Sequence, residues 1–153
     1  MELLIVIAVI GILAAALLVA IDPVDKIRAG NDSKVLGDVR QVYDAALRAY
    51  ASGNVMPTSI AGSAPSITTI GELRNEPKPP ATYGTNYTYA VNSASDDVCV
   101  SGRLMSKGQI AKAAAASVVG TSANLWITVN NGKTCYSAGA SAPGCTSGPA
   151  TCP

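Results

Sequence analysis

Few residues in this sequence of 153 residues belong to the types that carry out chemistry. There is no histidine, which removes the commonest general base and the commonest metal ligand. No nucleophile beside a base, phosphate-binding glycine loop or catalytic carboxylate pair stands out. Asp96 and Asp97 are adjacent acids, but calcium takes about six to eight oxygen ligands, so we interpret them as a solvated turn. The residues therefore predict no enzyme, no cofactor and no metal site.

Four cysteines are the most reactive groups in the chain. No two of them have the C-x-x-C spacing of a zinc or redox site. An even number of cysteines in a chain with an apolar N-terminus favours two disulfides and an oxidising compartment. Three pairings are possible, and we prefer one bond between two strands and one that closes a small loop in the tail. The preferred pairs are Cys99–Cys135 and Cys145–Cys152.

Glu2 is the one charged residue in a long apolar run. Every residue of 1–21 except Glu2 and Gly11 is Ala, Val, Ile, Leu or Met. At roughly 1.5 Å per residue, this run is long enough to span a bilayer as a helix. A signal peptide fits less well, because no basic region precedes the run and no small-residue cleavage site is followed by a polar start. A carboxylate in hydrocarbon is costly unless it is paired, so we expect a partner for Glu2.

Residues 2–15, Glu-Leu-Leu-Ile-Val-Ile-Ala-Val-Ile-Gly-Ile-Leu-Ala-Ala, resemble the N-terminal methylation segment of type IV pilins and pseudopilins. The acid, the unbroken aliphatic run and the Gly-Ile-Leu-Ala-Ala that follows make a highly specific motif. Residues 17–23 resemble a branch of the family whose helix-kinking proline comes slightly late, and beyond residue 52 only the general plan matches. Family members are cleaved after a glycine and usually begin Phe-Thr-Leu. We therefore expect a leader and the first mature residues to precede Met1.

The resemblance implies a structural subunit that polymerises into a helical extracellular filament of the type IV pilus kind. Residues 1–22 would first hold the subunit in the cytoplasmic membrane as a single pass and would then enter the filament core. Glu2 would pair with the N-terminal amine of a neighbouring subunit and fix the axial register. The implied partners are further copies of the chain, a prepilin peptidase, a membrane platform protein and an assembly ATPase.

The elements that position the apolar segment are a helix and a head. We expect the helix to kink or melt at Gly11 and Pro23, since proline removes a backbone donor and clashes with the preceding turn. Residues 23–52 continue as an amphipathic helix, with apolar residues every three or four positions. Charges four residues apart can pair on its surface. The candidate pairs are Asp22/Lys26, Lys34/Asp38 and Asp44/Arg48.

Residues 53–153 form the head, whose patterns indicate strands and two short helices. We therefore predict an α+β fold in which a long N-terminal helix, kinked near Pro23, packs against a small antiparallel β-sheet. The residues from Ala138 form a tail that owes its order to a disulfide. The expected elements are helices at Thr69–Asn75 and Gln109–Val119 and strands at Thr85–Val91, Val98–Leu104, Leu125–Asn130 and Thr134–Ser137, with Asn131-Gly132 as a turn.

Two other functions stay open. A pseudopilin of a type II secretion system would form a short, piston-like fibre from the same kind of helix. A single-pass membrane-anchored extracellular binding domain would need a basic or aromatic patch on the head. The net charge is +1 and the lysines and arginines are scattered, which argues against a nucleic-acid partner.

Overall fold

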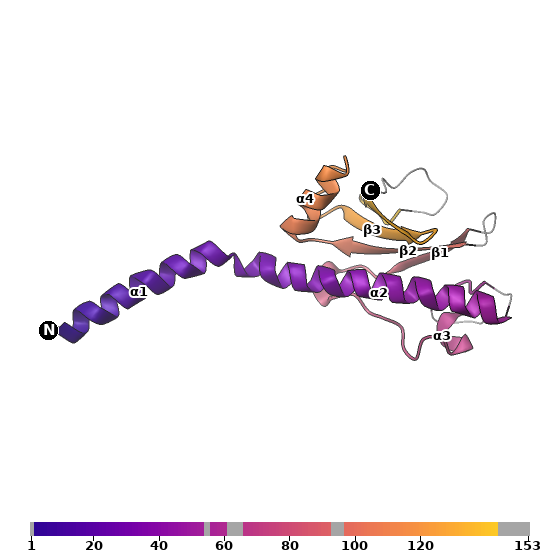
Figure 1. Ribbon diagram of the computed structural model, residues 1–153, viewed down its shortest axis with the longest axis horizontal. Helices are drawn as coiled ribbons and strands as arrows, with labels where there is room; N and C mark the ends of the chain where they lie inside the picture. Colours follow the sequence, from indigo (N-terminus) through magenta and orange to yellow (C-terminus); the bar gives the residue numbers. More distant parts are fainter. Residues whose placement is uncertain (1, 54–55, 61–65, 93–96, 144–153) are drawn as a thin grey trace.

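The computed structural model describes residues 2–53, 56–60, 66–92 and 97–143. Two long helices form a bent rod, and a four-stranded antiparallel sheet lies along the second of them (Figure 1). The predicted α+β fold is confirmed. The elements are α1 (Glu2–Ile21), α2 (Pro23–Gly53), α3 (Ile67–Ile70), the 3₁₀ turn η1 (Ala81–Tyr83), β1 (Thr88–Asn92), β2 (Asp97–Leu104), α4 (Lys107–Ala115), β3 (Leu125–Asn130) and β4 (Lys133–Ala138).

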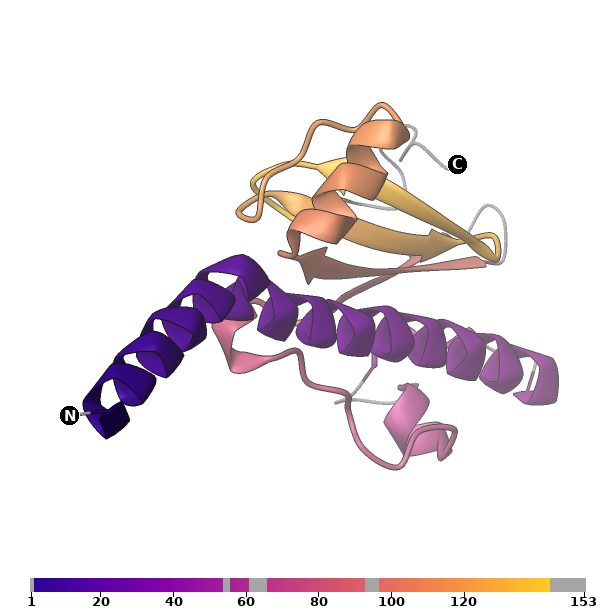
Figure 2. The same cartoon turned by 60° about the vertical axis from the view of Figure 1, so that its left-hand side comes forward.

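The rod is interrupted at Asp22, where α1 ends and α2 begins. Asp22 has a φ of 44°, in the left-handed region that continues neither helix nor strand. Its side chain caps α2, because the backbone N–H of Asp25 donates to Asp22 Oδ1 at 3.3 Å. Pro23 takes the first helical position, where a missing N–H costs nothing. The predicted kink near Pro23 is confirmed, and it lies where α1 ends and α2 begins as a separate helix (Figure 2).

At Gly11, by contrast, α1 continues unbroken, so the expected kink at this position is wrong for this structure. A glycine within a helix costs only about 1 kcal/mol relative to alanine, and its aliphatic neighbours support the helix. An added Cβ at Gly11 would meet no atom within 4 Å. Nothing therefore presses on the helix from the side to bend it there.

The core lies between α2 and one face of the sheet. Helix α2 lies close to β2 at Gly102, where an added Cβ would lie 2.6 Å from Val35 Cγ1 and 2.9 Å from Val39 Cγ2. A larger residue at position 102 would push α2 off the sheet. The buried side chains of this interface are Val35, Val39, Val42, Ala45 and Ala46 from α2 and Val98, Val100, Leu104, Leu125, Ile127 and Val129 from the sheet.

The strands follow the chain order β1-β2-β3-β4, each antiparallel to the next. Asn131 and Gly132 join β3 to β4 with φ values of 51° and 69°, which are the positive values of a tight hairpin turn. The expected turn is confirmed, and the last three strands match their predicted bounds to within a residue. The first expected strand begins three residues later, at Thr88.

The two short helices agree to different degrees with the helices predicted from the sequence. The predicted Ala-rich helix is present as α4, which begins after Ser106, whose hydroxyl accepts the N–H of Gln109 at 3.4 Å. The helix expected at Thr69–Asn75 is instead the single turn α3, which ends at Ile70 before Gly71. Gly71 has a φ of 89°, which is incompatible with a continued helix.

Candidate assembly and membrane surface

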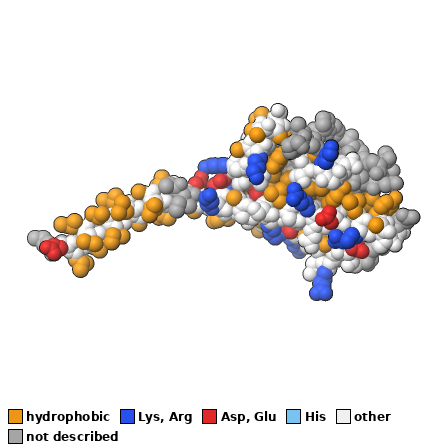
Figure 3. All heavy atoms as spheres, in the orientation of Figure 1, with side chains coloured by type: hydrophobic (Ala, Val, Ile, Leu, Met, Phe, Trp, Pro, Cys, Tyr) orange, Lys and Arg blue, Asp and Glu red, His pale blue; other side chains and the backbone are white. Residues whose placement is uncertain are grey.

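The surface of α1 is apolar and lies outside the core. Every side chain from Glu2 to Val19 is exposed, and this stretch of 18 residues has a mean hydropathy of 2.9 with none of it buried. Figure 3 shows it as an apolar rod that projects from the head. By length and composition, α1 could span a membrane or serve as a signal sequence.

Glu2 lies in the first turn of α1, at the end of the rod farthest from the head. A carboxylate is favourable there, since the N-terminus of a helix carries a partial positive charge. Among the described residues, no ion pair includes Glu2. The partner expected for its carboxylate would therefore come from outside the described chain.

Two carboxylates near the bend hold the loop that starts α4. Asp22 forms an ion pair with Lys107, and the backbone N–H of Lys107 donates to Asp25 Oδ1 at 2.8 Å. The hydrogen bond from Lys107 lowers the pKa of the Asp22 carboxyl, and the bond from the Asp25 N–H adds to this effect. We expected Asp22 to pair with Lys26, which is wrong. Asp22 has a non-helical φ of 44°, so helical spacing does not set the direction of its side chain, and its carboxylate pairs with Lys107.

A third carboxylate, Asp32, is fully buried, which the sequence did not lead us to expect. Its oxygens accept the N–H of Met105 at 3.0 Å, the N–H of Ser106 at 2.8 Å and the hydroxyl of Tyr83. Burial, together with the bond to Asp32, raises the pKa of the Tyr83 phenol. Its burial could have been predicted from helical spacing, because Asp32 stands three residues before Val35 on the apolar stripe of α2.

One of the other expected pairs on α2 is present. Lys34 Nζ lies 2.6 Å from Asp38 Oδ2, as predicted, and Asp38 also accepts the hydroxyl of Tyr87 at 2.7 Å. Arg48 does not pair with Asp44 as expected; its Nε contacts Glu72 at 3.2 Å. Helix α3 packs against α2 and carries the chain to Glu72, a contact that helix spacing alone could not predict.

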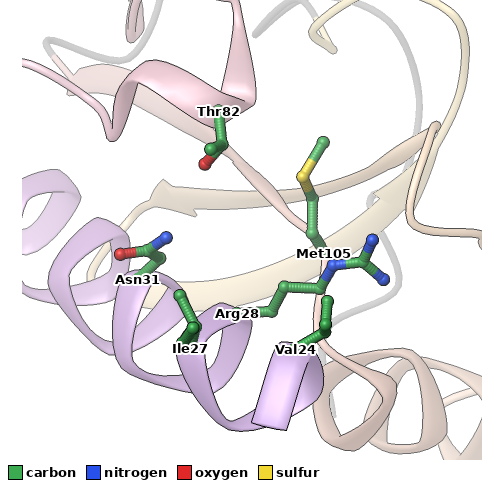
Figure 4. Close-up of a pocket in the computed structure, with 6 residues that line it drawn as sticks. All are labelled: Val24, Ile27, Arg28, Asn31, Thr82 and Met105. Carbon is green, nitrogen blue, oxygen red and sulfur yellow. The ribbon is translucent and has the colours of Figure 1, made fainter.

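A pocket of about 300 Å³ lies beside the bend, between the first turns of α2 and the head (Figure 4). Hydrogen bonds join the two head segments that line the pocket to α2. The hydroxyl of Tyr83 donates to the backbone carbonyl of Arg28 at 3.1 Å, and the N–H of Met105 donates to Asp32 at 3.0 Å. The lining residues are Val24, Ile27, Arg28, Asn31, Thr82 and Met105.

The cysteines do not pair as we preferred. Cys99 is a free, buried thiol and Cys135 is disulfide-bonded, so the pair Cys99–Cys135 is wrong. Strand β3 separates β2 from β4. Since neighbouring strands lie about 4.8 Å apart, residues two strands apart exceed the ~7 Å between Cα atoms that a disulfide can bridge. The second preferred pair, Cys145–Cys152, lies outside the described residues.

The structure thus defines a class of protein, an α+β head on a helix with a free apolar half of membrane-spanning length. Within the described residues, no cluster of three or more His, Cys, Asp or Glu could hold a metal ion. No protein-family model, curated protein or solved structure matches the chain. Its function is therefore inferred from its own residues.

Proposed function

We propose that the chain is a structural subunit that polymerises through α1 into a helical extracellular filament of the type IV pilus kind. The observation that carries this proposal is the exposure of α1, an apolar helix whose side chains from Glu2 to Val19 lie outside the core. The head has its own core between α2 and the sheet, to which residues 2–19 of α1 contribute nothing. The apolar helix is therefore free to pack against something else.

The free energy at stake is large. The large aliphatic side chains of α1 from Leu3 to Val19 are between 50% and 85% exposed. Fully burying one such side chain gives about 1.5–3 kcal/mol, so burial of the whole segment is worth on the order of 20 kcal/mol. These side chains are Leu3, Leu4, Ile5, Val6, Ile7, Val9, Ile10, Ile12, Leu13, Leu17, Leu18 and Val19. Both a bilayer and a bundle of the same helices from other copies would supply this burial.

Glu2 is what distinguishes these two surroundings. In a bilayer its carboxylate has no fixed partner and is costly to bury. In a bundle it would meet the N-terminal amine of a neighbouring copy. A buried ion pair adds little net stability, because desolvation offsets the attraction. We therefore assign Glu2 to the axial register between subunits.

In the proposed sequence of events, α1 first spans the cytoplasmic membrane once and then moves into the core of an extracellular filament. The motif in residues 2–15 supports the partners expected above: a prepilin peptidase, a membrane platform protein and an assembly ATPase. The ATPase would supply the energy of assembly from the cytoplasm.

The test replaces Glu2 with alanine in the full chain within its own cell. E2A should leave the amount of membrane-bound subunit unchanged and should abolish or strongly reduce sheared filaments, counted by electron microscopy. Asp44→Ala is the matched control, because it removes an exposed acid on α2, outside the apolar segment. It should assemble as the wild type does.

Two results would contradict the proposal. A normal filament yield from the Glu2→Ala variant would remove the role assigned to Glu2. Wild-type protein that is found only as dispersed, detergent-soluble monomer would favour a membrane-anchored binding domain. Fibres that stay short and never reach the cell surface would instead favour a pseudopilin.

A further inference from the structure

The pocket beside the bend lies where a membrane surface would be. The 18-residue stretch of α1 from Glu2 to Val19 makes a helix of about 27 Å, close to the ~30 Å hydrocarbon core of a bilayer. When α1 spans the membrane, Asp22 and the first turns of α2 therefore lie in the headgroup layer. The bend at Asp22 turns α2 away from the direction of α1, which keeps these turns close to that layer (Figure 2).

The lining of the pocket is partly apolar and unusually exposed. Val24 is 55% exposed and Ile27 is 66% exposed. Among the described residues outside α1, the only other large aliphatic side chain exposed to this degree is Val119. Met105 reaches the same pocket from the segment after β2 (Figure 4). Apolar surface thus continues past the membrane-length helix at this one face.

Arg28 brings a positive charge to the pocket. Three acids lie within six residues of Arg28, and each has another partner. Asp22 pairs with the side chain of Lys107, and Asp25 accepts the backbone N–H of Lys107. Asp32 is fully buried and accepts the N–H groups of Met105 and Ser106. No described ion pair includes Arg28. A half-buried guanidinium presents a fork of N–H donors that matches two phosphate oxygens.

We propose that this pocket binds an anionic phospholipid of the membrane that α1 spans. Arg28 holds the phosphate, with Asn31 and Thr82 as further polar groups, while Val24, Ile27 and Met105 contact the upper part of an acyl chain. The pocket volume lies at the lower end of the roughly 300–1,000 Å³ typical of small-molecule sites. The proposal rests on the membrane-bound stage of the proposed function and not on polymerisation.

The α1 helix of a second copy is the competing occupant. Its exposed surface from Leu3 to Val19 is aliphatic apart from glycine and alanine. Such a helix would cover the pocket and leave the charge of Arg28 desolvated without a partner, which is strongly unfavourable. A phosphate would instead pair with that charge. The lining therefore favours a lipid.

The test measures lipid retained by the full-length protein. Wild-type protein is reconstituted in nanodiscs of phosphatidylcholine mixed with phosphatidylglycerol, released in the mass spectrometer, and scored for bound lipid. We expect selective retention of one phosphatidylglycerol. Arg28→Gln should reduce that retention about tenfold, the loss typical of one charge-assisted hydrogen-bonded contact. Lys26→Gln is the matched control, because it removes the same charge from an exposed position on α2 outside the pocket.

Arg28→Lys should recover part of the retention, which excludes misfolding as the cause of the loss. A benzophenone amino acid in place of Ile27 should crosslink to phospholipid in membranes. Equal losses from Arg28→Gln and Lys26→Gln would overturn the proposal, as would crosslinking to a second copy. Displacement of the lipid by millimolar inorganic phosphate would also overturn it, by showing a site for free anions. Bound lipid is measured on the monomeric protein, whereas filament yield is measured on the Glu2→Ala variant. Either proposal can therefore fail without the other.

Discussion

Asp32 offers the sharpest test of how the head is held together. It is fully buried, and one oxygen accepts from Met105 N–H and Tyr83 hydroxyl while the other accepts from Ser106 N–H. Asp32→Asn keeps the shape of the side chain but turns one acceptor into a donor. An amide NH₂ would then face a backbone N–H, and that N–H would lose its partner.

The magnitude follows from the group left unpaired. A buried donor without an acceptor costs about 1–3 kcal/mol, so Asp32→Asn should lower the free energy of unfolding by that amount. Asp32→Ala leaves the N–H groups of Met105 and Ser106 without an acceptor, leaves the Tyr83 hydroxyl only the Arg28 carbonyl, and creates a cavity. Its loss should therefore be larger, about 3–5 kcal/mol. For a chain of this size, the smaller loss corresponds to a fall in the melting temperature of roughly 3–10 °C.

Trp126 provides the assay. It is the only tryptophan, its indole is 4% exposed, and its Nε1–H donates to the carbonyl of Gly139 at 3.0 Å. Its fluorescence therefore reports loss of the sheet during urea unfolding of the full chain in detergent micelles. Asp44→Asn removes the same charge from an exposed position on α2 and should leave the urea midpoint unchanged.

The reasoning about Asp32 is refuted if Asp32→Asn unfolds within about 0.5 kcal/mol of Asp44→Asn, the range expected of neutral surface changes. A double-mutant cycle sharpens the result. Tyr83→Phe removes one of the three donors, so it should lessen the damage done by Asp32→Ala. Strictly additive losses would show that Tyr83 and Asp32 are not coupled.

Three further outcomes are expected. Gly102→Ala should destabilise the head by about 1–3 kcal/mol in the same urea assay, because its methyl group would overlap α2; an unchanged midpoint would contradict the close approach of α2 to β2. Cys135→Ser should cost about 2–4 kcal/mol by removing a disulfide, and alkylation should reach the Cys99 thiol only after unfolding. The pKa of the Asp22 carboxyl, measured by NMR, should lie below the usual value of an aspartate and should rise in Lys107→Ala. Because folding lowers this pKa, the stabilisation is present above the unfolded-state pKa and is lost as the pH falls through the folded-state pKa.

Local patterns were enough to predict the elements themselves. The apolar run, the stripe of α2 and the Asn131-Gly132 turn each depend on neighbours in sequence, and each is present. The pair Lys34–Asp38 also lies within one helical stretch, where spacing fixes the geometry. Features of this kind need no knowledge of how distant segments meet.

Contacts between distant segments were not predictable in this way. The pairing of Cys99 with Cys135 failed because it depends on strand order, and β3 happens to lie between their strands. The partner of Asp22 comes from the start of α4, far along the chain. The burial of Asp32 was not predicted, because the groups that donate to it belong to the loop after β2, although its place on the apolar stripe indicated burial.

The break between α1 and α2 at Asp22 affects how far fraying of one helix can extend into the other. In the first turn of α2, the N–H groups of Asp25 and Lys26 bond to the Asp22 carbonyl and not to carbonyls of α1. Helix–coil cooperativity is carried by such bonds, so fraying or extension of α1 stops at Asp22. A chain that passes from one apolar medium to another would carry its folded end across intact.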